Sequence, residues 1–261
     1  MIITSSKNEQ VKWLKGLTQR KNRDAEGCFF VEGLRGVAEG MESGFKLRKL
    51  AVTEAFSKTP SFAAFAKNAD PAQIIIMSAG VFVEICETET PQGVAAVFEI
   101  PQNVKIGGDC IIMLENLRDP GNMGTVIRTA DAAGMSGVIC GKGCVDVYNQ
   151  KVIRSTAGSI FHIPVLRFED LDSVEIAEGL KKKGYRLYAA HPRGDVSCFD
   201  ERFEGKCVII IGNEANGISD SLLERCDSLL TIPMPGRAES LNASVAAALL
   251  IYEITRKKGF N

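Results

Sequence analysis

No long hydrophobic run occurs in this sequence of 261 residues, and charge of neither sign dominates it. Apolar runs such as residues 208–211 and 246–252 are far shorter than the roughly 18 residues that a membrane-spanning helix needs. The opening residues, MIITSSKNEQ, contain no cationic segment followed by an apolar one, so we expect no secretory signal peptide. With 31 Lys and Arg against 32 Asp and Glu, the net charge of −1 excludes a uniformly basic, histone-like protein but leaves room for a local basic patch.

Histidine is scarce, and no C-x-x-C pair occurs, which together argue against a zinc site. The chain has two histidines and eight cysteines, and no two cysteines form a C-x-x-C pair. Cys110, Cys140 and Cys207 lie in or beside apolar strand-like runs, where a free thiol packs as a small hydrophobic group. We therefore predict no bound metal, and reduced thiols in a cytoplasmic protein.

A change in composition near residue 103 divides the chain into two predicted domains, residues 1–103 and 104–261. The linker, PQNVKIGGD at residues 101–109, combines a proline, two adjacent glycines and few apolar side chains. Before it, short strands and helices alternate, which predicts a small α/β domain. The predicted strands are residues 28–32, 49–53, 73–77 and 94–99, and the predicted helices are residues 34–43, 60–67 and 79–87.

The first 25 residues carry a local excess of positive charge. Two acidic residues, Glu9 and Asp24, stand against six basic ones, which are Lys7, Lys12, Lys15, Arg20, Lys21 and Arg23. Residues 8–19 are predicted as a helix with three apolar residues on one side. Two interpretations stay open: a solvated helix that packs on the next domain, or a basic arm that contacts nucleic-acid phosphates.

Residues 104–261 show a stronger alternation of apolar strands and helices. The predicted strands are residues 110–116, 137–140, 186–190, 207–212 and 228–232, and the predicted helices are residues 122–133, 172–183, 219–226 and 241–257. Near-continuously apolar strands separated by helices favour a parallel sheet that is covered on both faces. Ligands of such sheets bind beyond the carboxyl ends of the strands, so those ends are where functional residues are expected.

The first strand-end segment of interest is NLRDPGNMGTVIRTADAAG at residues 116–134. Its Pro-Gly turn leads into a helix whose first backbone N–H groups are free to bind a ligand. Neither a Walker P-loop nor a G-x-G-x-x-G pattern is present. An ordinary turn would explain the Pro-Gly pair, but not the crowding of polar residues at one strand end, namely Asn116, Arg118, Asp119, Asn122 and Arg128.

Two further segments follow later strands. In IIIGNEANGIS, at residues 209–219, Gly212 permits close approach of a ligand to the backbone, and Glu214 follows it at the end of a buried strand. In IPMPGRAESLNASVAAALLI, at residues 232–251, two prolines bracket Met234 and hold an extended loop, after which Ser240 and Asn242 lie at the opening of an alanine-rich helix. The small residues of that helix predict very close packing against a neighbouring element.

These three segments, in this order, resemble the three motifs of the SpoU (TrmH-like) branch of the SPOUT methyltransferases, which are S-adenosylmethionine-dependent RNA ribose 2′-O-methyltransferases. The segments RSTAGSIFHIPV, at residues 154–165, and PQGVAAV, at residues 91–97, also resemble this family. The second is similar to the closing strand of the small ribosomal-protein-like RNA-binding domain of its rRNA-modifying members. The residues alone suggest an open, doubly wound sheet, whereas the resemblance implies a parallel-sheet α/β domain with a deep trefoil knot, plus a small N-terminal α/β domain.

The resemblance also implies the site residues and partners. Positions that would bind S-adenosyl-L-methionine are Gly212, Ile232, Met234 and Leu241, and the implied catalytic set is Asn122, Arg128, Glu214, Ser240 and Asn242. The substrate is expected to be RNA, with 23S rRNA favoured over tRNA because of the N-terminal domain, whose six basic residues are the expected RNA contacts. Family members form dimers through the knotted domain, so a homodimer around residues 241–257 is expected.

The sequence leaves open which group removes the proton of the 2′-hydroxyl. The family assignment often gives this role to the arginine, here Arg128, yet a neutral guanidine costs about 8 kcal/mol at pH 7. A charged Arg128 that grips a phosphate, with Glu214 or water as the base, is the other possibility. His162 and His191 lie outside the three motifs and are not expected to act as bases. Two alternative functions also remain, a catalytically inactive ribosome-assembly protein and a nucleotide-binding oxidoreductase, although no dinucleotide fingerprint supports the second.

Overall fold

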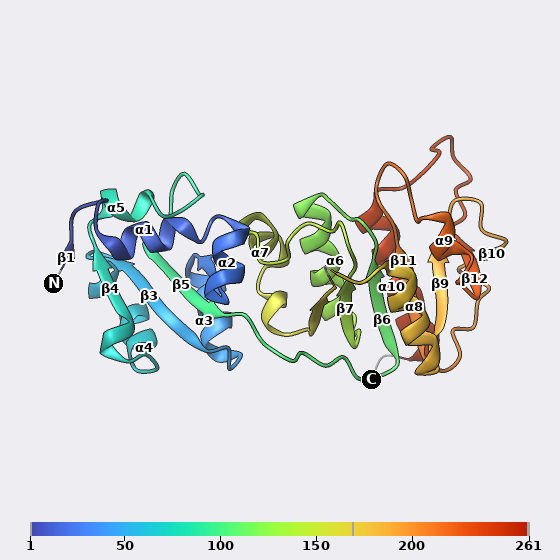
Figure 1. The fold of residues 1–261 in the computed structure, drawn as a ribbon, viewed down its shortest axis with the longest axis horizontal. Coiled ribbons are helices and arrows are strands. Elements are labelled where there is room, and N and C mark those ends of the chain that lie inside the picture. The colour runs from blue at the N-terminus through green and yellow to red at the C-terminus, as the bar shows by residue number, and fades with distance from the viewer. Residues whose placement is uncertain (1, 169, 260–261) are drawn as a thin grey trace. The chain divides into compact units, whose positions relative to one another are not determined.

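The computed structural model describes residues 2–168 and 170–259 and divides into two compact units (Figure 1). The first unit contains Met1–Asn103 and Asp146–Phe161, and the second contains Val104–Val145 and His162–Asn261. The chain therefore passes between the units three times. No helix within the described ranges combines the length and the hydropathy that a membrane span requires.

The first unit is built on a five-stranded sheet. Its strands are β1 (Ile2–Ile3), β2 (Cys28–Glu32), β3 (Leu47–Thr53), β4 (Ile74–Met77) and β5 (Val94–Glu99), in the order β1-β4-β3-β5-β2. β5 is antiparallel to both of its neighbours, and the other pairs are parallel. The helices are α1 (Glu9–Gly16), α2 (Arg20–Glu26), α3 (Leu34–Glu42), α4 (Pro60–Ala66), α5 (Ala79–Val83) and α7 (Gln150–Thr156), with the short 3-10 helices η1 (Phe56–Lys58), η2 (Pro71–Gln73) and η3 (Ser159–Phe161).

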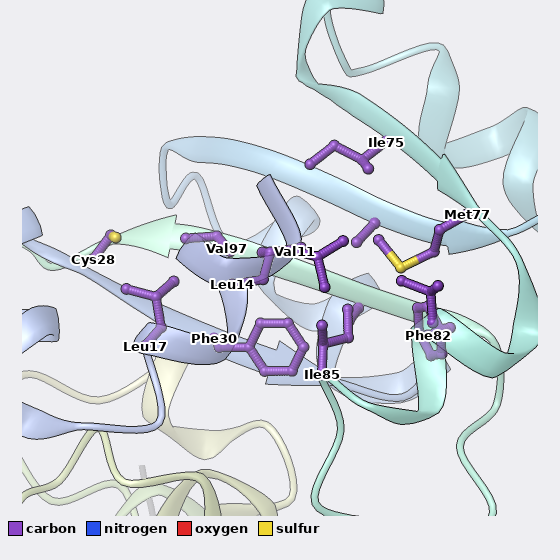
Figure 2. Packing of buried hydrophobic residues seen from close by; sticks show 13 residues of the cluster. Val11, Leu14, Leu17, Cys28, Phe30, Ile75, Met77, Phe82, Ile85 and Val97 are labelled. Atoms are coloured by element: carbon purple, nitrogen blue, oxygen red, sulfur yellow. The ribbon is translucent and has the colours of Figure 1, made fainter. Parts of the chain in front are cut away.

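Helices α1 and α5 contribute to a fully apolar core on one face of this sheet (Figure 2). Val11 and Leu14 are spaced so that both lie on the same side of α1, and neither is exposed to solvent. They share a cluster with Phe30 of β2, Val97 of β5 and Phe82 of α5. This burial fixes α1 on the sheet and leaves the polar side of the helix outside.

The segment Asp146–Phe161 belongs to the first unit because it packs on the sheet face opposite that core. Phe29 lies on the other side of β2 from Phe30, and its ring centroid is 4.6 Å from that of Tyr148 and 6.0 Å from that of Phe161. Arg154 of α7 adds an ion pair with Glu32, with 2.7 Å between Nη1 and Oε1.

The basic arm at residues 1–25 forms two short helices, α1 and α2, instead of the single predicted helix. Arg23, on α2, is only 2% exposed. Its guanidinium bonds Asp146, with 3.0 Å between Nε and Oδ2, and its Nη1 donates to the carbonyl groups of Leu17 and Thr18 at 2.8 and 2.7 Å. The guanidinium of Arg23 is therefore engaged inside the first unit, which argues against the predicted contact between Arg23 and RNA.

The second unit is built on a parallel sheet of seven strands. They are β6 (Cys110–Leu114), β7 (Gly137–Cys140), β8 (Val165–Arg167), β9 (Arg186–Ala190), β10 (Val196–Ser197), β11 (Cys207–Ile211) and β12 (Ser228–Thr231), in the order β10-β12-β9-β11-β6-β7-β8. All of these neighbouring pairs are parallel. The helices are α6 (Pro120–Ala132), α8 (Ser173–Lys182), α9 (Asp220–Leu223) and α10 (Ala243–Lys258).

The centre of this sheet positions the site. All five residues of β11 are buried, and they pair residue for residue with β6, from Cys207 opposite Cys110 to Ile211 opposite Leu114. Because the strands are parallel, the loops that follow β6, β9, β11 and β12 leave the same edge of the sheet. Helix α10 returns to pack against α6 and β11, and its buried Ala247 permits the close approach that the small residues predicted.

Candidate active site

A cavity of about 360 Å³ lies at the carboxyl ends of three neighbouring strands, β9, β11 and β12. Its apolar wall includes Leu230 and Ala246, and its polar wall includes residues that follow β9 and β11. Of the nine catalytic and cofactor residues predicted from the sequence, six line this cavity: Gly212, Glu214, Ile232, Met234, Ser240 and Leu241. The second and third sequence segments therefore meet at one place.

Gly212 begins a tight loop, residues 212–218, whose residues all line the cavity. A Cβ atom on Gly212 would lie 2.3 Å from the carbonyl carbon of Gly217 and 2.5 Å from the backbone nitrogen of Ile218. Asn213 and Gly217 close the loop by two backbone hydrogen bonds of 2.9 Å. No side chain fits at position 212 unless the loop moves, so this position requires glycine for space.

The side chain of Asn213 holds the 212–218 loop from within. Its Oδ1 accepts the backbone N–H groups of Ala215 and Asn216 at 2.9 and 3.1 Å. Its Nδ2 donates to the carbonyl oxygen of Asn116, beyond the end of β6, at 2.8 Å. Asn213 thereby ties the loop to the neighbouring strand.

Three polar side chains from the three sequence segments form one hydrogen-bonded chain. Asn242 Nδ2 donates to Asn122 Oδ1 at 3.0 Å, and Asn122 Nδ2 donates to Glu214 Oε1 at 2.9 Å. The two amides thus link Glu214, on the cavity wall, to the start of α10. Because a carboxylate only accepts hydrogen bonds, this donor fixes its orientation without supplying charge.

The two asparagines are positioned by the starts of their helices. Asn242 is the N-cap of α10, where its Oδ1 accepts the N–H groups of Ser244 and Val245. The backbone N–H of Asn122 donates to Asp119, the N-cap of α6, at 2.7 Å. The polar residues crowded after β6 therefore have two tasks, since Asp119 caps the helix and Asn122 reaches Glu214.

Arg128 does not belong to the cavity wall. It lies on α6, six residues after Asn122, and its side chain is exposed to solvent. Among the residues that the structure describes, the cavity lining does not include it. Its guanidinium is thus open to a large ligand that approaches from solvent.

His191 and Arg193, which follow β9, also line the cavity, although neither was predicted there from the sequence. The Nδ1 atom of His191 accepts the backbone N–H of Arg193 at 3.2 Å, so the neutral ring carries its proton on Nε2. The position directly after a predicted strand was the available signal, because that rule had identified the other segments. His162, in contrast, lies 3.2 Å from Asp131 of α6, measured between Nδ1 and Oδ2.

The remaining basic residues of the arm differ in their surroundings. Lys7, Lys12 and Lys21 are exposed to solvent. Lys15 forms an ion pair with Glu84, and the Nε atom of Arg20 lies 3.4 Å from an Asp24 oxygen. Within residues 2–168 and 170–259, no group of three or more His, Cys, Asp and Glu side chains is arranged to hold a metal ion.

Two family models match this chain. The model of the SpoU rRNA Methylase family matches residues 109–252, which include the whole cavity. The model of the MRM3-like substrate binding domain matches residues 8–96.

Individual relatives match over nearly the full length. The chain is 36% identical over 252 residues to the 23S rRNA (guanosine(2553)-2′-O)-methyltransferase RlmP of Bacillus subtilis, covering 97% of this chain and 98% of that protein. It is 32% identical over 266 residues to the 23S rRNA (uridine(2479)-2′-O)-methyltransferase of Streptomyces viridochromogenes, covering 98% and 92%. The crystal structure of the SpoU methyltransferase AviRb from Streptomyces viridochromogenes, in complex with the cofactor AdoMet, aligns with a TM-score of 0.88 at 30% identity, covering 97% of this chain and 98% of that one.

Proposed function

This chain belongs to the SpoU rRNA methylase family, and we propose that it transfers the methyl group of S-adenosyl-L-methionine to a ribose 2′-hydroxyl of 23S rRNA. One observation of the structure carries the proposal. One hydrogen-bonded chain joins Glu214, on the cavity wall, to Asn122 and Asn242. Asn122 lies more than 90 residues before the other two in the sequence. Arg128, Glu214 and Asn242, which the family resemblance implies as catalytic residues, are all present, and this argues against an inactive protein on the same scaffold. Both curated relatives named above act on 23S rRNA, which favours that substrate.

The cavity fits the proposed cofactor. Ile232 and Leu241 offer apolar surface suited to an adenine ring, and the backbone of the 212–218 loop offers peptide groups for polar contacts because Gly212 keeps that approach free of a side chain. Glu214, on the cavity wall, would supply a negative charge suited to the sulfonium of the cofactor. When bound, S-adenosyl-L-methionine supplies a methyl group that is already activated for displacement.

The protein's part in such a displacement is largely positioning. The reaction needs the 2′-oxygen in line with the methyl carbon, and orientation of this kind supplies much of a rate enhancement. Asn122 and Asn242 hold Glu214, while Ser240 lines the same cavity. In our proposal these four residues fix the ribose and the cofactor relative to each other.

Exposed Arg128 binds an RNA phosphate in this proposal. As a permanently charged group with a planar fork, it suits a phosphate better than it suits the role of a base. The oriented carboxylate of Glu214, directly or through water, then accepts the 2′-hydroxyl proton.

The N-terminal domain, residues 1–103, is proposed to recognise the RNA, supported by its match to a substrate binding domain. Exposed Lys7, Lys12 and Lys21 are the primary candidates for phosphate contacts, with Lys15 and Arg20 available once their surface ion pairs open. With rRNA as the substrate, we propose a cytoplasmic location for the protein.

We further propose a homodimer and a trefoil knot in the second unit, both from the family resemblance. Val245, Leu249 and Tyr252 are 47%, 41% and 46% exposed, and their spacing places them on one side of α10. Three large exposed apolar side chains in a stripe favour a covered surface, and a second copy of the chain is the proposed partner.

The proposal is tested by methyl transfer in solution. The purified protein is incubated with tritiated S-adenosyl-L-methionine and either a 23S rRNA transcript or single-stranded DNA of the same sequence. We expect label on the RNA alone, released as a 2′-O-methylnucleoside after digestion. Equal labelling of the DNA, or a methyl group on a nucleobase, would contradict the proposal.

A further inference from the structure

Glu115 is a buried acidic residue directly after β6, the strand beside β11. It is 9% exposed. Its carboxylate accepts two hydrogen bonds from one residue, Ser219: Oε2 accepts the backbone N–H at 2.8 Å, and Oε1 accepts the hydroxyl at 2.8 Å. Ser219 lies 104 residues away and is the N-cap residue of α9.

The position of these bonds is informative because Ser219 directly follows the 212–218 loop. The residue directly before that loop is Ile211, and its carbonyl oxygen accepts the backbone N–H of Glu115 at 2.9 Å. Glu115 therefore holds both ends of the loop, the start through its main chain and the end through its side chain. All residues between these two points line the cavity.

The 212–218 loop needs such an anchor. Its backbone is folded so tightly that Gly212 and Gly217 are in direct contact, and five of its seven residues, Asn213 to Gly217, are not buried. Exposed loops with few buried contacts open at low free-energy cost. Hydrogen bonds to a carboxylate are stronger than those between neutral groups. The two hydrogen bonds from Ser219 to the Glu115 carboxylate, which we call the clamp, therefore oppose this opening.

We propose that Glu115 is a positioning residue that keeps the 212–218 loop in the shape that binds the cofactor. This inference rests on the proposed function of the cavity. Among the described residues, Glu115 is not part of the cavity lining, and it contacts the loop through Ser219. It therefore affects cofactor affinity without contacting the cofactor. Removing the clamp lets the end of the loop move and lowers the population of the competent cavity.

Three variants test the clamp at increasing severity. Glu115→Gln keeps a carbonyl oxygen for the backbone N–H of Ser219 and an amide donor for its hydroxyl oxygen. Ser219→Ala removes only the hydroxyl contact. Glu115→Ala removes both contacts. Asp227→Ala is the matched control, since Asp227 also accepts a backbone N–H, that of Leu187 at 2.8 Å, but is not part of the cavity lining within the described residues.

Calorimetry measures the S-adenosyl-L-methionine affinity of each full-length variant, and steady-state kinetics with rRNA measures KM and kcat. We expect Glu115→Ala to raise Kd and the cofactor KM at least tenfold while kcat at saturating cofactor changes less than threefold. Ser219→Ala should raise Kd by about two- to fivefold, and Glu115→Gln should stay within threefold of the wild type. Asp227→Ala should lower the melting temperature and leave Kd unchanged.

Hydrogen exchange supplies a readout that a general loss of stability would not reproduce. In Glu115→Ala the amides of residues 213–219 should exchange faster, while those of β11 keep their protection. Unchanged Kd in both Glu115→Ala and Ser219→Ala overturns the inference, as does a loss of kcat with unchanged KM. Should Glu115→Ala fail to fold, Ser219→Ala alone decides. If the wild type itself does not bind S-adenosyl-L-methionine, the proposed function fails, and that result is distinct from failure of the clamp.

Discussion

Replacing Gly212 by alanine tests whether the 212–218 loop forms the cofactor site. The added Cβ would lie 2.3, 2.4 and 2.5 Å from three backbone atoms of Gly217 and Ile218. Ordinary contact begins near 3.4 Å. The two sides of the loop must therefore separate by about 1 Å, and neither side is a flexible side chain that moves easily.

The cost of this separation follows from overpacking. Inserting a methyl group into a closely packed site costs about 1–3 kcal/mol. If the bound loop must keep its present shape, this cost falls on binding, and about 1.4 kcal/mol corresponds to a tenfold change in affinity. We therefore expect Gly212→Ala to weaken S-adenosyl-L-methionine binding by roughly 5- to 150-fold.

Isothermal titration calorimetry measures this loss, with Gly179→Ala as the control. Gly179 lies within α8 of the same unit, and a Cβ there would meet no atom within 4 Å. The control should keep its cofactor affinity and gain up to about 1 kcal/mol of stability, because alanine favours the helix. If Gly212→Ala binds S-adenosyl-L-methionine as tightly as Gly179→Ala does, the cofactor does not depend on the shape of this loop and our placement of the site is refuted.

Three further predictions follow from the exposed residues and the thiols. Arg128→Ala should lower turnover by roughly 10²–10³-fold, as loss of one charge-stabilising donor does, with S-adenosyl-L-methionine affinity by calorimetry within twofold; a large loss of that affinity would instead place Arg128 at the cofactor. Leu249→Glu should shift the protein from dimer to monomer in analytical ultracentrifugation, because it places a charge in the apolar stripe of α10; an unchanged dimer would move the interface elsewhere. The pKa of Cys110 is lowered to about 7, first by its hydrogen bond with Cys207, 3.6 Å away between sulfur atoms, and then by the charge of Lys258. The rate at which iodoacetamide labels Cys110, measured by peptide mass spectrometry, should therefore increase as the pH is raised through 7. Faster labelling of any buried cysteine than of Cys110 near pH 7 would contradict this.

Much of the fold was predictable because its strands are short apolar runs with clear ends. The predicted strands 28–32, 94–99, 137–140 and 186–190 agree residue for residue with β2, β5, β7 and β9. Strands β1, β8 and β10 were missed, since two or three residues are too few to show a periodic pattern. Helix α10 begins at Ala243, not at residue 241, because Asn242 serves as its cap.

Site residues were predictable from the sequence where the strand or helix that positions them is adjacent in the chain. Gly212 and Glu214 follow a buried strand, and Ser240 precedes a helix, so each could be placed on the sheet edge from local sequence. Long-range partners were not visible. Arg23 looked like a surface charge because its partner, Asp146, lies 123 residues away, and the packing of residues 146–161 on the first unit has the same origin. The role of Glu115 likewise depends on Ser219.

The most direct test of the central claim is a map of ribose methylation in 23S rRNA. Total RNA is compared between cells that contain this protein, cells that lack its gene, and cells complemented with the wild type or with Asn122→Ala. We predict that one 2′-O-methyl position in 23S rRNA disappears with the gene and returns with the wild-type protein. It should not return with Asn122→Ala, which breaks the hydrogen-bonded chain to Glu214. A 23S rRNA methylation pattern that is the same in all four samples would contradict it.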